Sequence, residues 1–237
     1  MFGAGGMVNH HLEQMAQAIF KSWFVDFEPF GEVQPMTWVI GKAEDFFDIA
    51  IGKTPPRKEP EWFTTNPKDV IWVSISDMGS CGMFISDSSE YLTAESVERF
   101  NVKIVPSGTV LLSFKLTVGR VAITDGEMTT NEAIAHFKQL SDVTLEYLYC
   151  YLKAFDYQSL GNTSSIATAV NSKTIKAMPF VMPDEKALAD FHAATAPLFE
   201  QVRVNLAENA RLATLRDTLL PRLMSGKLSV TDLGDAK

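Results

Sequence analysis

The chain has 237 residues, of which 46% are hydrophobic, and a formal net charge of −8 at pH 7. It is long enough to bury a sizeable core, in one large domain or in one domain with added helices. No apolar run approaches the roughly 20 residues of a membrane span and no signal peptide is visible, so we expect a soluble, cytoplasmic protein. The acidic balance excludes a broadly basic surface. Binding to DNA would need locally clustered Lys and Arg, or a partner that supplies part of the phosphate attraction.

The first 30 residues divide into two parts. We interpret residues 1–6, MFGAGG, as a leader before a start at Met7 and leave them out of the fold prediction. Within residues 7–30, apolar side chains recur at helical spacing from Leu12 to Phe27, which predicts an amphipathic helix of about four turns that ends near Phe27. Its aromatic side chains are interpreted as a packing surface.

In residues 31–183, short apolar runs alternate with turn residues. Helical segments are expected at 43–47 and 145–155, with a strand directly after the first of them. Further strands are expected in the runs 70–75, 103–114, 120–124 and 133–139. This pattern predicts the α+β class, with one strand-rich mixed domain rather than a doubly wound nucleotide-binding unit.

Residues 184–224 predict one long helix that Pro221 is expected to close, followed by a tail at residues 225–237. A narrow apolar seam runs along this helix and consists of Phe191, Leu198, Val202, Asn205, Asn209, Leu212 and Leu219. Asn in such a seam suits a partner helix, because buried Asn fixes the register of a coiled coil. We therefore predict a coiled coil. The alternative is an ordinary surface helix that packs on its own domain.

Residues with catalytic or metal-binding chemistry are sparse. Cys81 and Cys150 lie far apart without CxxC or His spacing, and the four His residues show no metal-ligand spacing. No glycine-rich phosphate loop follows a strand. A nucleophilic pair of Cys81 and His136 stays open as an alternative. We therefore expect no catalytic residue, no metal ligand and no cofactor in this chain.

Two terminal segments carry a family resemblance. Residues 215–227, LRDTLLPRLMSGK, resemble part of the C-terminal conserved helix in the specificity subunits of bacterial type I restriction-modification systems. Residues 12–30, LEQMAQAIFKSWFVDFEPF, are similar to the end of the central conserved helix of the same subunits. Between them, four runs resemble successive parts of a target-recognition domain: residues 52–56, 71–78, 110–123 and 170–183. The resemblance covers nearly the whole chain.

This resemblance implies a non-catalytic subunit that recognises double-stranded DNA and positions a methyltransferase subunit, with or without a restriction subunit. S-adenosylmethionine is then expected on the methyltransferase subunit. In the family that this chain resembles, a full-length specificity subunit has two target domains and two conserved helices in tandem, whereas this chain has room for one target domain. It therefore resembles a half subunit, and we expect a homodimer with antiparallel long helices that recognises a bipartite site.

Three loops are expected to contact DNA bases and phosphates and to converge on one edge of the domain. The first contains Lys53, Thr54, Arg57 and Lys58, and the second contains Lys115, Thr117 and Arg120. The third contains Asn162, Thr163, Ser164, Ser165, Thr168, Asn171 and Lys173. An alternative function is a coiled-coil adaptor whose central domain binds protein or carbohydrate. The acidic balance favours that alternative, and the two terminal segments oppose it.

Overall fold

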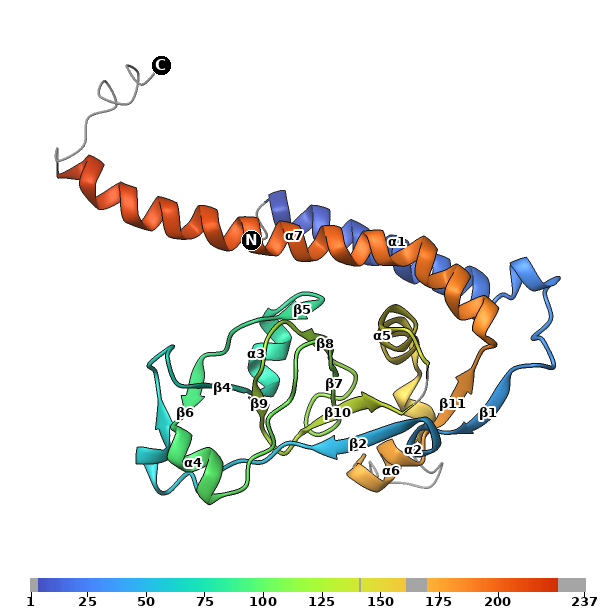
Figure 1. The fold of residues 1–237 in the computed structure, drawn as a ribbon, viewed down its shortest axis with the longest axis horizontal. Helices are drawn as coiled ribbons and strands as arrows, with labels where there is room; N and C mark the ends of the chain where they lie inside the picture. The colour runs from blue at the N-terminus through green and yellow to red at the C-terminus, as the bar shows by residue number, and fades with distance from the viewer. Residues whose placement is uncertain (1–3, 141, 161–169, 226–237) are drawn as a thin grey trace, which may run out of the picture.

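Two helices lie along one side of a strand-rich central domain, residues 39–182 (Figure 1). The computed structural model describes residues 4–140, 142–160 and 170–225. The predicted α+β class is confirmed, with a helix at the start of the chain and a long helix at its end. Across the described ranges, no helix combines the length and the apolar character needed to cross a membrane.

The first and last helices, α1 (Ala4–Phe24) and α7 (Glu185–Met224), run antiparallel to each other. Phe24, at the end of α1, lies 5.1 Å from Phe191 near the start of α7, measured between ring centroids. Asn9, near the start of α1, accepts a hydrogen bond of 2.8 Å from the side chain of Asn205. Helix α1 therefore covers only about the first half of α7.

Both helices differ from their predicted bounds. Helix α1 begins at Ala4, so residues 4–6 continue the helix, and it ends at Phe24. Helix α7 continues through Pro221 to Met224, so the expectation that Pro221 closes it was wrong. A proline removes one backbone donor from a helix. Here the helix ends within a turn of the proline, so the residue weakens the helix end without stopping it at once.

The central domain is built on a five-stranded sheet with the order β2-β10-β7-β8-β5. Its strands are β2 (Phe47–Ile51), β10 (Ile134–Gln139), β7 (Val110–Ser113), β8 (Val121–Thr124) and β5 (Phe84–Ile85). The pairs are antiparallel except for β5 with β8. Every residue of β7 and β8 is buried, as expected for strands that are covered on both faces.

Two smaller sheets flank this one. A four-stranded sheet has the order β3-β6-β4-β9, and its strands are β3 (Phe63–Thr64), β6 (Glu90–Leu92), β4 (Val70–Val73) and β9 (Thr129–Thr130). Strands β1 (Val39–Lys42) and β11 (Pro179–Met182) pair with each other where the domain joins the two long helices. The shorter helices are α2 (Ala43–Phe46), α3 (Ile75–Ser80), α4 (Ala94–Arg99), α5 (Leu145–Ala154), α6 (Ser172–Lys176), η1 (Glu28–Phe30), η2 (Pro60–Trp62) and η3 (Tyr157–Leu160).

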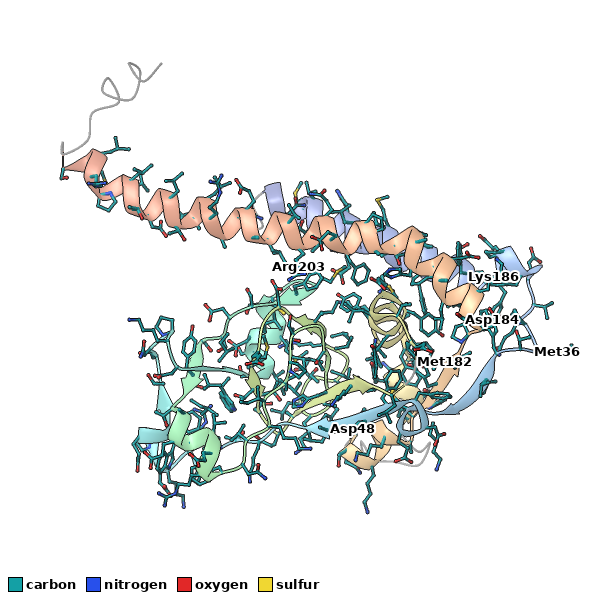
Figure 2. All side chains as sticks on the ribbon, viewed as in Figure 1. Met36, Asp48, Met182, Asp184, Lys186 and Arg203 are labelled. Atoms are coloured by element: carbon teal, nitrogen blue, oxygen red, sulfur yellow. The ribbon has the colours of Figure 1, made fainter. Side chains whose placement is uncertain are left out.

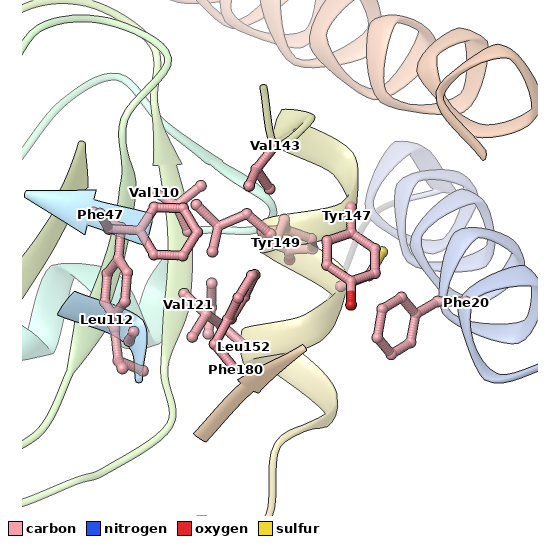
Figure 3. Close-up of a cluster of buried hydrophobic side chains, with 14 of the residues drawn as sticks. Phe20, Phe47, Val110, Leu112, Val121, Val143, Tyr147, Tyr149, Leu152 and Phe180 are labelled. Carbon is pink, nitrogen blue, oxygen red and sulfur yellow. The ribbon is translucent and has the colours of Figure 1, made fainter. Parts of the chain in front are cut away.

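Aromatic side chains join α1, α5 and α7 in the largest core cluster. Phe24 packs edge-on against Tyr147 of α5 at 4.8 Å and against Phe191 of α7. Figure 3 shows Phe20 of α1 next to Tyr147, with Val110, Leu112 and Val121 of the sheet on the other side of α5. Helix α5 therefore lies between the sheet and the long helices.

The seam predicted on α7 divides into two parts. Phe191 and Val202 are buried in the core of the chain itself, Leu198 is half-buried against it, and Asn205 bonds to Asn9 of α1. The first half of α7 therefore packs on helices α1 and α5 of its own chain. The buried residues follow the 3.6-residue helical period through Phe199, which is 3% exposed and which the seven-residue seam omitted.

The second half of α7 extends beyond α1 (Figure 1). Asn209 and Leu212 are exposed and Leu219 is half-buried, and Leu215 and Leu220 are also exposed. In the first half, Arg203 forms an ion pair of 3.1 Å with Asp125 of the central domain, toward which it points in Figure 2. The helix is thus fixed on its domain up to about residue 206 and exposes apolar side chains after that.

Candidate nucleic-acid interface

The loop after β2 begins at Gly52, where only glycine fits. Its backbone N–H donates to the carbonyl of Ile134 at 3.1 Å, and the next N–H, of Lys53, donates to Thr130 at 2.9 Å. A Cβ atom at Gly52 would lie 2.1 Å from Thr130 Oγ1 and 2.2 Å from the carbonyl oxygen of Asn131. The close approach of two backbone segments therefore sets where the loop leaves the sheet.

Arg57 fastens this loop to the four-stranded sheet. Its guanidinium donates two hydrogen bonds, of 2.9 and 2.8 Å, to the carboxylate of Glu90 and lies 4.1 Å from the ring centroid of Phe63 and 4.6 Å from that of Trp72. The hydrogen bonds to Glu90 raise the pKa of Arg57, and those from Arg57 lower the pKa of Glu90. Arg57 is engaged within the chain, so it supplies little free charge for a phosphate.

Of the other residues of this loop that were predicted to contact DNA, two are hydrogen-bonded within the chain and one is not. Lys53 Nζ donates to the carbonyl of Phe100 at 2.5 Å, and the Thr54 hydroxyl donates to the carboxylate of Glu132. Lys58 is exposed, and within the described part of the chain no ion pair or hydrogen bond engages its ammonium group. Lys58 is therefore the cation of this loop that is best placed to meet a ligand.

The loop between β7 and β8 is held by the buried Ser113. Its hydroxyl donates to the carbonyl of Thr117 at 2.6 Å and accepts from the backbone N–H of Arg120 at 3.0 Å. Lys115 and Thr117 are exposed, as expected for contacts with a ligand. Arg120 is half-buried, and its side chain donates to the carbonyl of Ile75 at 2.5 Å. It therefore ties α3 to the sheet.

These two loops leave the five-stranded sheet at the same end. Strand β2 ends at Ile51, opposite Ala135 of β10, and β7 ends at Ser113, opposite Ile134. One strand separates them, so their exits lie about 10 Å apart, twice the spacing between neighbouring strands. The predicted convergence on one edge therefore holds for the first two loops.

The third loop is described only in part. Asn162, Thr163, Ser164, Ser165 and Thr168 lie outside the described residues. The side-chain oxygen of Asn171 caps α6 by accepting from the backbone N–H groups of Lys173 and Thr174. Helix α6 packs beside α2, which precedes β2 (Figure 1). Asn171 and the exposed Lys173 therefore lie at the opposite end of β2 from Lys53, and the predicted convergence was wrong for these two residues.

Sequence reasoning overlooked two cations close to the first loop. Arg99 is exposed, with its guanidinium 5.0 Å from the ring centroid of Trp62. Lys103 is exposed and lies close enough to the buried His136 for its charge to act on that group. The sequence signal was a pair of cations, with Arg99 at the end of α4, which Thr93 caps, and Lys103 four residues later.

The proposed nucleophilic pair of Cys81 and His136 is not supported. Cys81 Sγ donates to the carbonyl of Met78 at 3.6 Å, and burial raises the pKa of its thiol to about 11. His136 Nε2 lies 2.6 Å from Thr130 Oγ1, and burial lowers the pKa of its imidazole to about 4. Neither side chain bonds to the other, and a protonated thiol is a poor nucleophile. Among the described residues, no cluster of three or more His, Cys, Asp or Glu is arranged to hold a metal ion.

The first two loops, which carry Lys58 and Lys115 and are called the basic loops below, belong to a segment that matches a known family. The family model described as "Type I restriction modification DNA specificity domain" (Methylase_S) matches residues 35–188, from just before β1 to the start of α7. The chain belongs to this family. The first two loops and residues 170–173 therefore all lie within the specificity domain.

Curated relatives have similar sequences but longer chains. The chain is 24% identical over 291 aligned positions to the HindI specificity subunit of Haemophilus influenzae, in an alignment that covers 93% of this chain and 62% of that subunit. It is 25% identical over 247 positions to the MjaIX specificity subunit of Methanocaldococcus jannaschii, with 95% and 55% covered. The chain thus spans little more than half the length of these relatives.

The fold also matches a solved structure. The crystal structure of the HsdS subunit from Thermoanaerobacter tengcongensis superposes with a TM-score of 0.57 at 16% identity, over 94% of this chain and 53% of that one. The predicted arrangement, a strand-rich domain with a shorter helix before it and a long helix after it, therefore matches the fold of about half of that HsdS subunit.

Replacing Gly52 by Ala should destabilise the specificity domain by about 1–3 kcal/mol, because the added methyl group overlaps the backbone of residues 130–131. Gly82 is the matched control, since a Cβ there meets nothing within 4 Å. Urea unfolding of both variants measures the difference. Equal stability of Gly52→Ala and Gly82→Ala would show that the close approach is not a constraint.

His136 should make the stability of the domain depend on pH. Because its pKa falls to about 4 in the folded chain from an ordinary value near 6.5, the unfolded chain binds the proton first. The contribution of His136 to the free energy of unfolding is complete above about pH 6.5. About 3 kcal/mol of it is lost as the pH falls from there toward 4. In urea unfolding at several pH values, the advantage of the wild type over His136→Gln should shrink across that window. Parallel curves would contradict the assignment.

Proposed function

We propose that this chain is the DNA sequence-recognition subunit of a type I restriction-modification complex. The observation that carries the proposal is the family match across residues 35–188, which includes both basic loops. The chain then contributes sequence recognition and no catalytic residue. A methyltransferase subunit with bound S-adenosylmethionine performs the reaction, with or without a restriction subunit, in the cytoplasm. The adaptor alternative rests on the acidic balance, and the family match across residues 35–188 opposes it.

The charge distribution suggests how the work is divided between the subunits. The net charge is −8, and Arg57 and Arg120 are engaged inside the chain. Lys58 and Lys115 remain as exposed cations on the two loops. The logarithm of the binding constant for duplex DNA falls linearly with the logarithm of the salt concentration, and the size of this salt slope rises by about 0.9 for each phosphate that the protein neutralises. We infer that this subunit makes few phosphate contacts itself, and that its partners supply most of the non-specific attraction.

The deciding experiment is co-expression of the chain with a type I methyltransferase subunit, followed by sequencing of modified bases in plasmid DNA. We expect the two proteins to co-purify and to methylate one defined sequence. Methylation without a defined sequence, or no co-purification, would overturn the proposal.

Replacing Lys58 and Lys115 together by Gln should weaken binding of the assembled complex to its target and lower the salt slope by about 2, one for each lost phosphate contact. The matched control replaces Lys42 and Lys186, which are exposed and paired with Glu44 and Asp190 away from the loops. Titration of a fluorescent target duplex at several salt concentrations measures both effects. Equal losses of affinity in the two double variants would show that Lys58 and Lys115 are no closer to the bound DNA than the control lysines.

We further propose that two copies pair through the second half of α7. The first half is covered by α1, whereas Leu212, Leu215, Leu220 and Met224 are exposed beyond it. This free part, residues 206–224, is about 28 Å long at 1.5 Å per residue. Antiparallel pairing of the same stretch in two copies continues the α1–α7 packing and closes a two-fold axis. The target site is then two inverted half-sites with unrecognised bases between them.

Leu215→Asp together with Leu220→Asp should convert the dimer to a monomer, because charged side chains would face the apolar surface of the partner helix. Val204→Asp, at an exposed position on the part of α7 that lies beside α1, is the matched control and should stay dimeric. Sedimentation analysis over a concentration series gives the solution masses. A wild-type chain that is monomeric at every accessible concentration would remove the pairing proposal and leave the DNA-recognition proposal in place.

A further inference from the structure

Leu116, at the tip of the β7–β8 loop, has an exposed apolar side chain on an unfavourable backbone. Its φ angle is +60°, and its side chain is 97% exposed. Left-handed backbone is unfavourable for residues with a Cβ atom, and glycine adopts it without that penalty. Burial usually compensates for an apolar side chain in such a position, but Leu116 has none. The stability of the folded chain therefore gives no reason for leucine at this position.

The loop that carries Leu116 is held firmly below its tip. Ser113 is buried, and its hydroxyl and carbonyl bond to the backbone of Thr117, Gly119 and Arg120. The N–H of Phe114 donates to the carbonyl of Ala133, just before the neighbouring strand β10, at 2.9 Å. Leu116 is therefore presented on a fixed support, which reduces the entropy lost when it binds a ligand.

The surroundings of Leu116 favour DNA as its ligand. The exposed Lys115 and Thr117 flank it, and the loop that contains Lys58 leaves the sheet at the same end. Lysine and threonine bond to phosphates and base edges, and an apolar side chain contacts the methyl group of thymine or enters between base pairs. A protein partner normally needs an apolar patch of several hundred Å². Apart from Leu116, the large exposed apolar residue of this loop is Val118, at 36% exposure.

We propose that Leu116 contacts the bases of the target duplex directly and is a specificity-determining residue of this subunit. The inference rests on the proposed function. Lys115 then contributes to affinity for any DNA, whereas Leu116 contributes to the choice of sequence.

Leu116→Gly and Leu116→Ala should lower the affinity of the assembled complex for its own target about 5- to 100-fold, the range of one good base contact. Affinity for a duplex of unrelated sequence should stay within about 2-fold, because the phosphate contacts are kept. The melting temperature of Leu116→Gly should equal or exceed that of the wild type, since glycine relieves the left-handed backbone. Lys115→Gln should instead weaken both duplexes by similar factors.

Ile40→Ala is the control for loss of an exposed apolar side chain, because Ile40 is 67% exposed on β1 of the two-stranded sheet. The Ile40→Ala variant should keep the wild-type ratio of affinities for target and unrelated DNA. A target duplex with uracil in place of thymine separates the two kinds of base contact. Loss of affinity in the wild type but not in Leu116→Ala indicates a contact with the thymine methyl group. Equal responses of both proteins, with specificity still reduced in the variant, indicate insertion between base pairs.

Leu116 variants that keep the wild-type ratio between target and unrelated DNA would overturn the inference and leave the proposed function standing. A wild-type complex that methylates no defined sequence would overturn both.

Discussion

The aromatic packing of α1 and α5 against the first half of α7 is the interaction on which the rest of the structure depends. Phe24, Tyr147 and Phe191 come from three helices that are far apart in the sequence, and their rings meet edge to face. Such contacts combine a large buried area with a preferred geometry, so they fix how the helices are oriented as well as how strongly they associate. Glu13 of α1 adds polar contacts to Tyr149 and Lys153 of α5. The specificity domain is thereby set at a fixed position along α7.

That fixed position gives the two loops a defined orientation relative to the long helix. Each loop is fastened by internal polar contacts, the first through Arg57 and Glu90 and the second through Ser113. Of these groups, Arg57 was predicted from the sequence to contact DNA. On these two loops, Lys58 and Lys115 are the exposed cations whose ammonium groups have no hydrogen bond or ion pair within the described residues.

The elements that the sequence predicted well are those with sustained periodicity. Helices α1, α5 and α7 and strands β4, β8 and β10 were expected close to where they lie, because four or more residues repeat one pattern. Strand β7 covers only four residues of the run 103–114 that was expected to form a strand. Strands β3, β5 and β9 have two residues each, too few to show alternation. The start of helix α3 is marked in the sequence by a capping box between Ser74 and Asp77, although no helix was predicted there.

The candidate site was harder to predict because it depends on tertiary contacts. The sequence showed that the first two loops carry cations, but it could not show that Arg57 faces Glu90, 33 residues away, or that Arg120 packs against α3. The placement of Asn171 and Lys173 also followed from packing, since α6 is held beside α2. The seam on α7 was assigned to a partner for the same reason: an apolar stripe does not reveal whether its own chain covers it.

The anchoring of the β7–β8 loop has a consequence for how this protein can change over evolution. Its supports are Ser113, Phe114 and Gly119, and they lie at the base of the loop. Residues 115–118 are all exposed, and the buried side chains lie at the base of the loop. New side chains can therefore be exchanged there one at a time without repacking the core. Within one short loop, the residues that can vary are thus separate from the residues that fold it.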